Sequence, residues 1–287
     1  MGDVLTGFHA AWEFESDSVL IRYERGIRTP KLFQALGVRR IPLAALARVT
    51  LGPGRRGTVV LRAEPRPGAD PLMDAADGQL TEGNDPYRLV LPAEQEPLAE
   101  RRAAELSALL TGSGPCDRHL VDPPEAPLRF KAYDGKASFD GGTVRFRWSW
   151  TGASSAKWKT GDQSFPVGEL GGVEWRSPEA DEGHLRLLPR EPAAAASPPS
   201  RPADQDPAAV VFGRGYGRVH ESLPFAAAVL AAARATASAA PVPVAAAARR
   251  DPADIAERIR HLGELHQAGL VTDEEFTVKK AQLLAEL

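Results

Sequence analysis

Cysteine is almost absent from this sequence: Cys116 is the single one among 287 residues. One cysteine cannot form a disulfide within the chain, and such usage suits a reducing compartment such as the cytoplasm. Cys116 stands in a stretch rich in glycine and proline, and we do not expect it to act as a nucleophile. We therefore expect neither an internal disulfide nor a thiol-based active site.

Long hydrophobic runs are also missing. No apolar stretch reaches the roughly 18–20 residues that span a bilayer, and the longest candidate, 225–233, is mostly alanine and ends at Arg234. The N-terminus has no basic region followed by an apolar core, so we expect no secretion signal. A net charge of −3 gives no general reason to expect nucleic acid as a partner. These features predict a cytoplasmic protein, with peripheral association at a membrane as the alternative.

The sequence lacks the recurring patterns of enzymes and metal sites. Its six histidines do not stand at metal-binding spacings, and with one cysteine the supply of ligands is thin. The glycine-rich stretch 213–217 has neither the Lys-Ser/Thr of a phosphate loop nor the spacing of a dinucleotide fingerprint. No Gly-x-Ser-x-Gly elbow occurs. We therefore predict a protein that is not an enzyme, with no catalytic, cofactor-binding or metal-binding residues.

An internal repeat is the most informative feature that is present. Residues 8–111 are echoed about 124 positions later by residues 129–235. The best match pairs 41–51 with 165–175, where both copies read bulky apolar, Pro, apolar, two spacers, Leu, two spacers, Val. A second match pairs the Asp-Pro of 85–86 with that of 206–207, and an apolar run follows each. Two copies of about 105 residues indicate two like-folded domains that arose by duplication.

Each repeat opens with a predicted β-hairpin. In the first repeat, apolar residues alternate over 12–15 and 19–23 around a turn at 16–18. In the second repeat, period-two spacing places four large apolar residues on one face of a strand: Val144, Phe146, Trp148 and Trp150.

Further strands and one helix follow in each repeat. The Ile/Phe-Pro motif should start a strand with its proline in first position, where a missing N–H costs least. Strands over 57–62 and 183–188, irregular inserts over 64–84 and 189–205, and a strand after each Asp-Pro come next. Closing helices are expected over 98–110 and 224–235. The first of these has an apolar stripe that includes Leu98, Leu106 and Leu109.

This order predicts a mainly β chain with helices (α+β). Each repeat would be a curved antiparallel sheet whose open end is capped by its C-terminal helix, which is the layout of the pleckstrin-homology-like fold. We place the first domain at 7–111, a linker at 112–127, and the second domain at 128–235 with a flexible insert at 189–205. A disordered Ala/Pro linker over 236–250 follows.

Residues 251–287 predict a helical hairpin. Asp251 is a good N-cap, Gly269 ends the first helix, and Thr272 with Glu275 forms a capping box for the second. Units of fewer than about 40 residues are rarely stable alone, so the apolar stripes should contact a partner, a second copy or the chain's own domains. The residues expected in this contact are Ile255, Ile259, Leu262, Leu265, Phe276, Leu283 and Leu284.

Two resemblances follow from these motifs. The run Ala268-Gly269-Leu270-Val271-Thr272, followed by Glu274-Glu275-Phe276 and Lys279-Lys280, resembles the short C-terminal domain called SHOCT. The Ile/Phe-Pro-x-x-x-Leu-x-x-Val motif and the Asp-Pro strand resemble domain-of-unknown-function family 4429, placed among bacterial pleckstrin-homology-like domains. The resemblance implies no established enzymatic activity and, for SHOCT, a role in oligomerisation or partner contact.

Cationic and aromatic residues alternate near the start of the second repeat. Seven lysines or arginines stand between 129 and 159 against two aspartates, with three tryptophans interleaved. Cations at the mouth of a sheet can bind phosphate, and tryptophans beside them suit a lipid interface or base stacking. The candidate anion-binding residues are Lys136, Arg145, Arg147, Lys157 and Lys159. The competing interpretation is that these cations lie on solvated strand faces while Trp148 and Trp150 belong to the core.

These observations predict a non-enzymatic binding or scaffold protein that needs no cofactor. Its repeats would be recognition modules, and its C-terminal hairpin would serve oligomerisation or docking of a protein partner. The alternative is peripheral binding to anionic lipid, or another polyanion, through the basic-aromatic hairpin of the second repeat. An enzyme of an unrecognised type is a third hypothesis.

Overall fold

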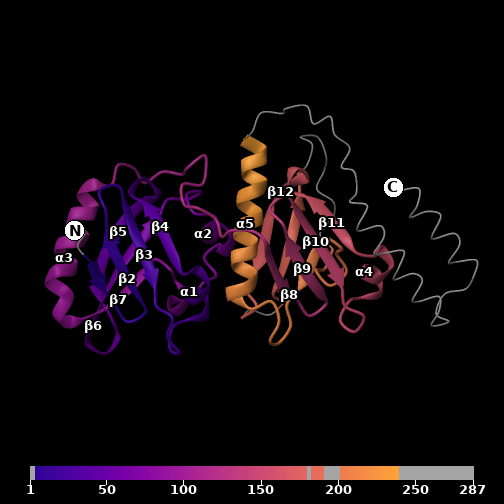
Figure 1. Ribbon diagram of the computed structural model, residues 1–287, viewed down its shortest axis with the longest axis horizontal. Coiled ribbons are helices and arrows are strands. Elements are labelled where there is room, and N and C mark those ends of the chain that lie inside the picture. The colour runs from indigo at the N-terminus through magenta and orange to yellow at the C-terminus, as the bar shows by residue number, and fades with distance from the viewer. Residues whose placement is uncertain (1–3, 180–181, 191–200, 239–287) are drawn as a thin grey trace, which may run out of the picture. The chain divides into compact units, whose positions relative to one another are not determined.

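The computed structural model describes residues 4–179, 182–190 and 201–238 (Figure 1). These residues belong to one compact unit that spans Met1–Ala239. The hairpin predicted over 251–287 lies outside the described residues. So do most of the linker predicted over 236–250 and the centre of the insert predicted over 189–205.

The described residues of the first repeat form two antiparallel sheets and three α-helices. One sheet has the order β1-β2-β3-β4, the other has the order β5-β6-β7, and α3 follows the last strand. The elements are β1 (Val4–Thr6), β2 (Ala10–Phe14), β3 (Ser18–Tyr23), α1 (Lys31–Leu36), β4 (Val38–Pro42), β5 (Leu46–Pro53), β6 (Thr58–Pro65), α2 (Pro71–Ala76), β7 (Arg88–Pro92) and α3 (Glu96–Leu109).

The described part of the second repeat has the same succession of strands. Its sheets have the orders β8-β9-β10-β11 and β12-β13-β14, and α5 follows them. The elements are β8 (Leu128–Lys131), β9 (Gly135–Phe139), β10 (Thr143–Trp148), α4 (Ser155–Thr160), β11 (Gln163–Pro166), β12 (Leu170–Arg176), β13 (His184–Pro189), β14 (Ala209–Val211) and α5 (Val219–Ser238). The prediction of a mainly β, α+β chain with antiparallel sheets is confirmed.

Alternation of apolar residues explains the first sheet of each repeat. In β3, Val19, Ile21 and Tyr23 are buried, whereas Arg22 faces solvent. Each large apolar side chain that is fully buried contributes about 1.5–3 kcal/mol to folding. In β10 the pattern holds through Trp148, but Trp150 is 80% exposed because the strand ends before it. The prediction that Trp150 faces the core is therefore wrong.

The proline of the repeated motif ends a strand instead of starting one. Pro42 is the last residue of β4, and Pro166 is the last residue of β11. A single turn of 3-10 helix follows each proline before β5 or β12 begins. Proline is tolerated here because β4 and β11 are edge strands, where a missing N–H can face away from the single neighbouring strand.

The insert over 64–84 is more regular than predicted, because it contains α2. Asp70 caps this helix by accepting a hydrogen bond from the Leu72 N–H at 2.9 Å, and Pro71 occupies the first helical position. Asp70 is buried and also accepts hydrogen bonds from Arg39 at 2.8 Å and from the Tyr87 hydroxyl at 2.7 Å. Burial is the main reason why the pKa of Tyr87 lies well above its ordinary value. This cluster fixes α2 against β4 and the start of β7.

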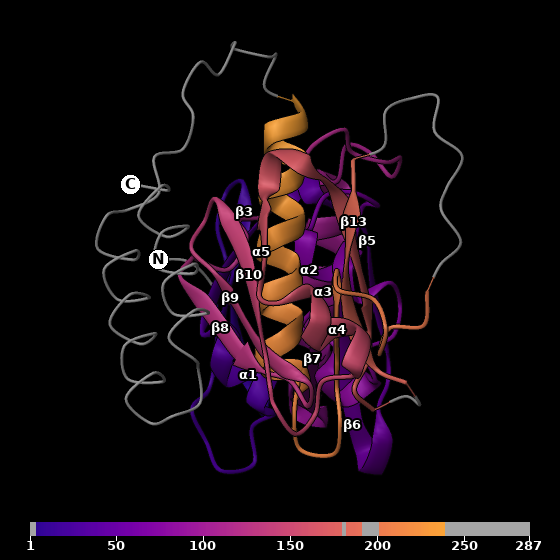
Figure 2. The same cartoon turned by 90° about the vertical axis from the view of Figure 1, so that its right-hand side faces the viewer.

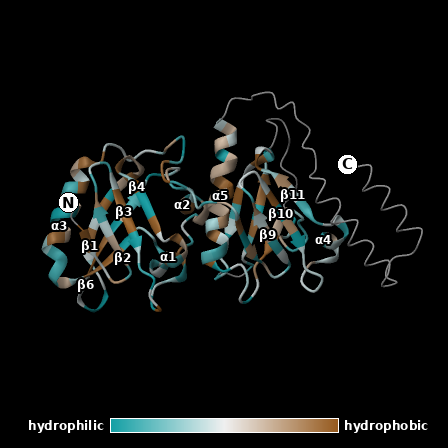
Figure 3. Cartoon of the chain, viewed as in Figure 1, coloured by the Kyte–Doolittle hydropathy of each residue, from teal (hydrophilic) through white to brown (hydrophobic). Residues whose placement is uncertain are grey.

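The two closing helices differ in character. Helix α3 buries Ala99 and Leu106 but leaves Leu109 52% exposed, so the predicted stripe is only partly buried. Helix α5 is apolar on most sides, and Figure 3 shows this contrast in hydropathy. Helix α5 begins five residues earlier than predicted, at Val219. Buried Ser222 anchors that extra turn by accepting a hydrogen bond from the Trp175 indole and donating one to the Gly217 carbonyl.

Helix α5 is packed on both repeats. Within its own repeat it contacts β8 and β12 (Figure 2), and from the first repeat it contacts α1 and α2. The Gln79 side chain adds two hydrogen bonds across the repeats, donating to the Trp175 carbonyl at 2.8 Å and accepting from the Ser177 N–H at 2.9 Å. The described parts of the two repeats therefore share a core instead of being joined by a linker alone.

Equivalent backbone hydrogen bonds in the two repeats show which residues correspond. The turn before the second strand of each repeat bonds to the last strand, and the residue after each proline bonds to the turn between the second and third strands. The pairs are Phe8 N–H to Val90 O (3.0 Å) with Tyr133 N–H to Val211 O (3.0 Å), and Leu43 N–H to Asp17 O (2.8 Å) with Val167 N–H to Gly142 O (2.9 Å). An ion pair also recurs, between Arg62 and Asp85 and between Arg186 and Asp206.

Candidate anion-binding cleft

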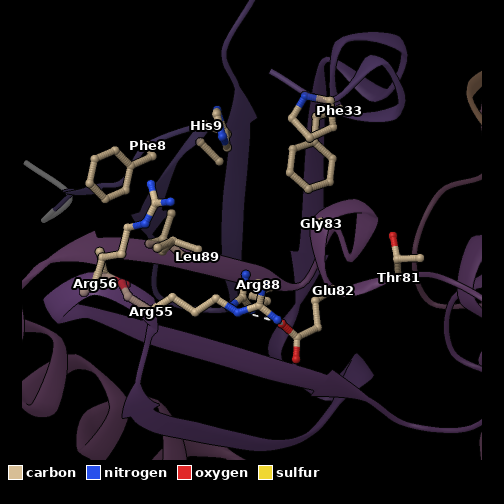
Figure 4. Close-up of a pocket in the computed structure, with 14 residues that line it drawn as sticks. Phe8, His9, Phe33, Arg55, Arg56, Thr81, Glu82, Gly83, Arg88 and Leu89 are labelled. Carbon is tan, nitrogen blue, oxygen red and sulfur yellow. Dashed lines mark hydrogen bonds and ion pairs between the residues drawn. The ribbon is translucent and has the colours of Figure 1, made fainter. Parts of the chain in front are cut away.

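A cleft of about 840 Å³ lies in the first repeat, where its two sheets meet (Figure 4). Its wall combines the turn between β1 and β2, the start of β7, the turn before β6, the start of α1 and residues 81–83. These segments are far apart in the sequence, so the cleft exists only in the folded chain. Its polar side chains include three arginines and one glutamate, and its apolar side chains include two phenylalanines.

A tight turn presents two arginines to the cleft. Arg56 and Gly57 have φ angles of 55° and 71°, so the chain reverses within a few residues. The Thr58 hydroxyl donates a hydrogen bond to the Arg55 carbonyl at 2.7 Å, and the Thr58 carbonyl accepts one from the Gly54 N–H at 2.7 Å. Because these bonds order the backbone, Arg55 and Arg56 extend from a defined position although the Arg55 side chain itself is exposed.

Arg88 and His9 bring further nitrogen donors from other elements. Arg88 is the first residue of β7, and its guanidinium is mostly shielded from solvent. Glu82 is the one carboxylate among the described residues of the wall. Its Oε2 lies 3.9 Å from the Arg55 guanidinium and 3.8 Å from the Arg88 guanidinium. Such long contacts to an exposed carboxylate contribute little to stability. Three arginines against one glutamate leave a net positive charge that an anion could neutralise.

Two aromatic rings, Phe8 and Phe33, also line the cleft (Figure 4). Phe33 is buried and stacks on Tyr23 with ring centroids 4.9 Å apart, which fixes its position. Phe8 is half exposed and is held by its N–H bond to the Val90 carbonyl. The neighbouring residue must be glycine, since a Cβ on Gly7 would lie 2.4 Å from that carbonyl oxygen. The cleft can therefore offer cations to an anionic group and rings to an apolar one.

Three of the five residues predicted for anion binding in the second repeat share one exposed face of β9 and β10, where Lys136 lies directly opposite Arg147 and Arg145 is two residues further along. Lys136 and Lys159 are exposed, while Arg145 and Arg147 are exposed but paired with Asp140 at 2.6 Å and Asp162 at 3.4 Å. Lys157 is fully buried and cannot contact an external ligand, which corrects the prediction for this residue.

Lys157 is enclosed by groups that satisfy its charge. Its ammonium donates to Asp134 at 2.5 Å and to the Ala209 carbonyl at 2.8 Å, and it lies 5.0 Å from the centre of the Trp148 ring. Burial raises the pKa of Asp134 and lowers that of Lys157, and their mutual attraction opposes both shifts. The pair is therefore part of the core of the second repeat.

Two tryptophans near this core are exposed instead. The rings of Trp150 and Trp158 meet edge to face with centroids 4.9 Å apart, and the side chains are 80% and 47% exposed. The predicted partner residues of the C-terminal hairpin, from Ile255 to Leu284, lie outside the described residues.

Sequence reasoning missed the cleft of the first repeat. Residues 22–66 contain eleven lysines or arginines against two glutamates, and Arg55-Arg56 stands between glycines. That local signal could have pointed to the turn. Nothing local joins it to Phe8, His9 or Arg88.

Other classes of site are not found among the described residues. No described helix is long and apolar enough to cross a membrane. Within the same residues, no group of three or more His, Cys, Asp or Glu side chains could hold a metal ion.

Comparison with known families locates both repeats and the C-terminal segment. The family model described as a domain of unknown function (DUF4429) matches residues 12–107 and again residues 137–230. The model described as a short C-terminal domain (SHOCT) matches residues 257–284. No curated protein matches the chain.

Proposed function

The chain belongs to the DUF4429 family, a family whose function is unknown. We propose that it is a non-enzymatic binding protein whose first repeat recognises an anionic ligand. The observation that carries this proposal is the cleft, which three arginines line together with Phe8 and Phe33. Arginine binds phosphate and carboxylate groups through paired N–H donors. The ligand would place such a group at the arginines and an apolar portion against the rings.

The order of elements supports the further proposal that each repeat is a pleckstrin-homology-like domain. Four antiparallel strands, three more strands and a closing helix occur in each. We assign these domains to 7–111 and 128–235. Such a fold serves here as a rigid frame for loops, and the cleft is built mainly from loops and strand ends.

The C-terminal segment adds a second proposed role, in assembly. Its match to a short C-terminal domain supports a helical hairpin that docks a protein partner or a second copy of the chain. Removing residues 251–287 and measuring mass by light scattering tests this role. An unchanged mass together with an unchanged set of co-purified partners would reject it.

Phenyl phosphate is a suitable probe for the cleft, because it joins a dianionic group to a ring. We expect saturable binding by the full chain, weakened as ionic strength rises. Arg55→Gln with Arg88→Gln should lower affinity at least tenfold. Arg48→Gln is the matched control, since Arg48 lies on β5 of the same repeat, is exposed and pairs with Glu64. Equal affinities in these two variants, or no binding by the unaltered chain, would contradict the proposal.

Benzyl alcohol separates the two halves of the recognition. It has the ring without the charge, so we expect it to bind far more weakly than phenyl phosphate. Inorganic phosphate has the charge without the ring, and it should fall between them. If all three probes bind alike, the cleft has no preference for an anion attached to an apolar group.

The exposed Trp150 and Trp158 favour a second candidate, peripheral binding to anionic lipid. Tryptophan rings suit the membrane interface, and Arg147 and Lys159 lie close to them in the sequence. Vesicles rich in phosphatidylserine should sediment the chain at low salt, and Arg145→Ala with Arg147→Ala should release it. Failure to sediment at low salt would remove this candidate.

A further inference from the structure

We infer that each chain has one anion site of this kind. The equivalent position in the second repeat is occupied by the side chain of Lys157, which is paired with Asp134. This inference rests on the function proposed for the first repeat. The Lys157–Asp134 ion pair would occupy the place where the arginines of the first repeat pair with a bound anion.

The equivalence of the two places comes from the backbone. Phe8 and Tyr133 donate the same hydrogen bond to the last strand of their repeats, at 3.0 Å in both cases. The next residue in each repeat accepts a second equivalent hydrogen bond. The His9 carbonyl accepts one from the Glu24 N–H at 2.9 Å, and the Asp134 carbonyl accepts one from the Ser149 N–H at 2.8 Å. His9 therefore corresponds to Asp134.

The last strand and the preceding turn can be matched in the same way. The Arg88 N–H bonds to the Asp85 carbonyl, and the Ala209 N–H bonds to the Asp206 carbonyl. Arg88 thus corresponds to Ala209. The pairing of β5 with β6 has the same register as the pairing of β12 with β13, and the register shift near the start of β5 recurs near the start of β12. Residues 45–66 therefore correspond to residues 169–190. Arg55 then corresponds to Glu179.

Charge is consequently reversed between the two places. The first repeat has His9, Arg55 and Arg88 where the second has Asp134, Glu179 and Ala209. An anion that approached the second place would meet the exposed carboxylate of Glu179 instead of guanidinium groups, and Asp134 is already paired with Lys157.

The space behind these residues is also used differently. Phe33 corresponds to Lys157, since α1 and α4 have matching positions before the C-terminal glycines Gly37 and Gly161. Phe33 stacks on Tyr23, an uncharged contact that leaves the cleft wall apolar. Lys157 instead lies beside the Trp148 ring with its ammonium on Asp134.

The substitute ion pair is fully satisfied within the chain. One carboxylate oxygen of Asp134 accepts from the Lys157 ammonium, and the other accepts from the Val211 N–H at 2.9 Å. The ammonium has a second acceptor in the Ala209 carbonyl. Since both charges are buried and paired, a ligand could displace them only by leaving one of them unpaired.

An aromatic residue covers the outside of the second place. Tyr133, the counterpart of Phe8, packs on Gly213 so closely that a Cβ there would lie 2.9 Å from its side chain. The Tyr216 ring meets the Tyr133 ring edge to face at 6.3 Å, and the Lys131 ammonium lies 5.0 Å from the Tyr216 ring centre. Phe8 makes no ring contact of this kind among the described residues, although the two side chains are equally exposed, at 52% for Phe8 and 53% for Tyr133.

The test is to map phenyl phosphate on the full chain by the amide and indole resonances of an ¹⁵N-labelled sample. We expect saturable shifts at the amides of Phe8 and Arg88, and no saturable shift at Tyr133, Ala209 or the Trp148 indole. Arg55→Gln with Arg88→Gln should raise the phenyl phosphate concentration that half-saturates these shifts at least tenfold. Glu179→Gln, in the equivalent turn of the second repeat, should leave affinity within twofold of the unaltered chain.

The outcomes separate this inference from the proposal beneath it. Shifts at both places, or binding that survives Arg55→Gln with Arg88→Gln and maps to Tyr133 and Ala209, would overturn the single-site inference and leave anion binding intact. A chain that shows no shift at any probe concentration would overturn both. The amide spectra of the variants, compared with that of the unaltered chain, show whether each variant has folded.

Discussion

Replacing Lys157 with methionine isolates the energetics of the closed place in the second repeat. Methionine keeps most of the aliphatic volume of lysine but removes the ammonium. The Asp134 carboxylate would then lose the hydrogen bond from the Lys157 ammonium and keep the one from the Val211 N–H. Its side chain is almost fully buried. The Ala209 carbonyl would lose its side-chain donor as well. The variant therefore leaves a buried carboxylate without its counter-ion.

The expected loss is large on the scale of a folded domain. Breaking a buried ion pair by removing one partner costs about 3–5 kcal/mol. For a unit of this size, each 1 kcal/mol lowers the melting temperature by about 2–4 °C, so the variant should melt roughly 6–20 °C below the unaltered chain. Asp134→Asn added to Lys157→Met should recover at least about 2 kcal/mol, since a neutral amide can still accept the Val211 N–H.

Urea denaturation followed by tryptophan fluorescence measures these differences. Arg147→Met is the matched control, because it breaks an exposed pair in the same repeat and should cost no more than about 0.5 kcal/mol. The deficit of Lys157→Met should shrink as the pH falls. The folded variant would bind a proton at Asp134 at pH values where the unfolded aspartate, with a pKa of about 3.9, is still charged. A deficit below about 1 kcal/mol, or no recovery in the double variant, would refute this reasoning.

Three further predictions concern other parts of the described chain. Burial alone would raise the pKa of Asp74, but hydrogen bonds from His119 and a backbone N–H lower it overall. The stabilising effect of Asp74 is therefore present above about pH 4 and lost on further acidification, so the advantage of the unaltered chain over Asp74→Asn should fall between pH 5 and pH 3 in thermal melts. Tyr87→Phe removes a donor from a buried carboxylate and should cost about 1–3 kcal/mol in urea denaturation. Gly217→Ala should cost about 2–4 kcal/mol in the same assay, because its Cβ would lie 2.1 Å from the Phe212 ring and its φ is positive. Gly215 also has a positive φ but open space around it, so Gly215→Ala should cost only about 1 kcal/mol. Equal losses would contradict the steric argument.

The order of strands was largely predictable because each strand leaves a local pattern. Alternation through β3 and β10 marks one buried face, and the Asp-Pro pairs mark the start of the last strand in each repeat. The errors fell where a local rule had two solutions. Proline can be the first residue of a strand or the last residue of an edge strand. The position of Pro42 follows from the sheet, in which β4 pairs with β3 and with no other described strand.

The candidate site was much less predictable. Lys157 was grouped with exposed cations because its sequence neighbours are charged and aromatic. Its burial depends on Asp134, on a backbone carbonyl in β14 and on the Trp148 ring, which approach it from three separate elements. Helix periodicity gives no sign of such a partner, since the partner comes from outside the helix.

The sequence by itself determined the duplication, the α+β class and the positions of most strands, because apolar periodicity and turn residues act over a few neighbouring positions. Tertiary structure alone decided which cations are exposed, which are neutralised and which share a cleft. Charges interact through space, and Arg55, Arg88 and Glu82 become neighbours only when β5, β6 and β7 pair into one sheet. For the same physical reason, two repeats with one apolar skeleton can differ in the sign of the charge at equivalent places.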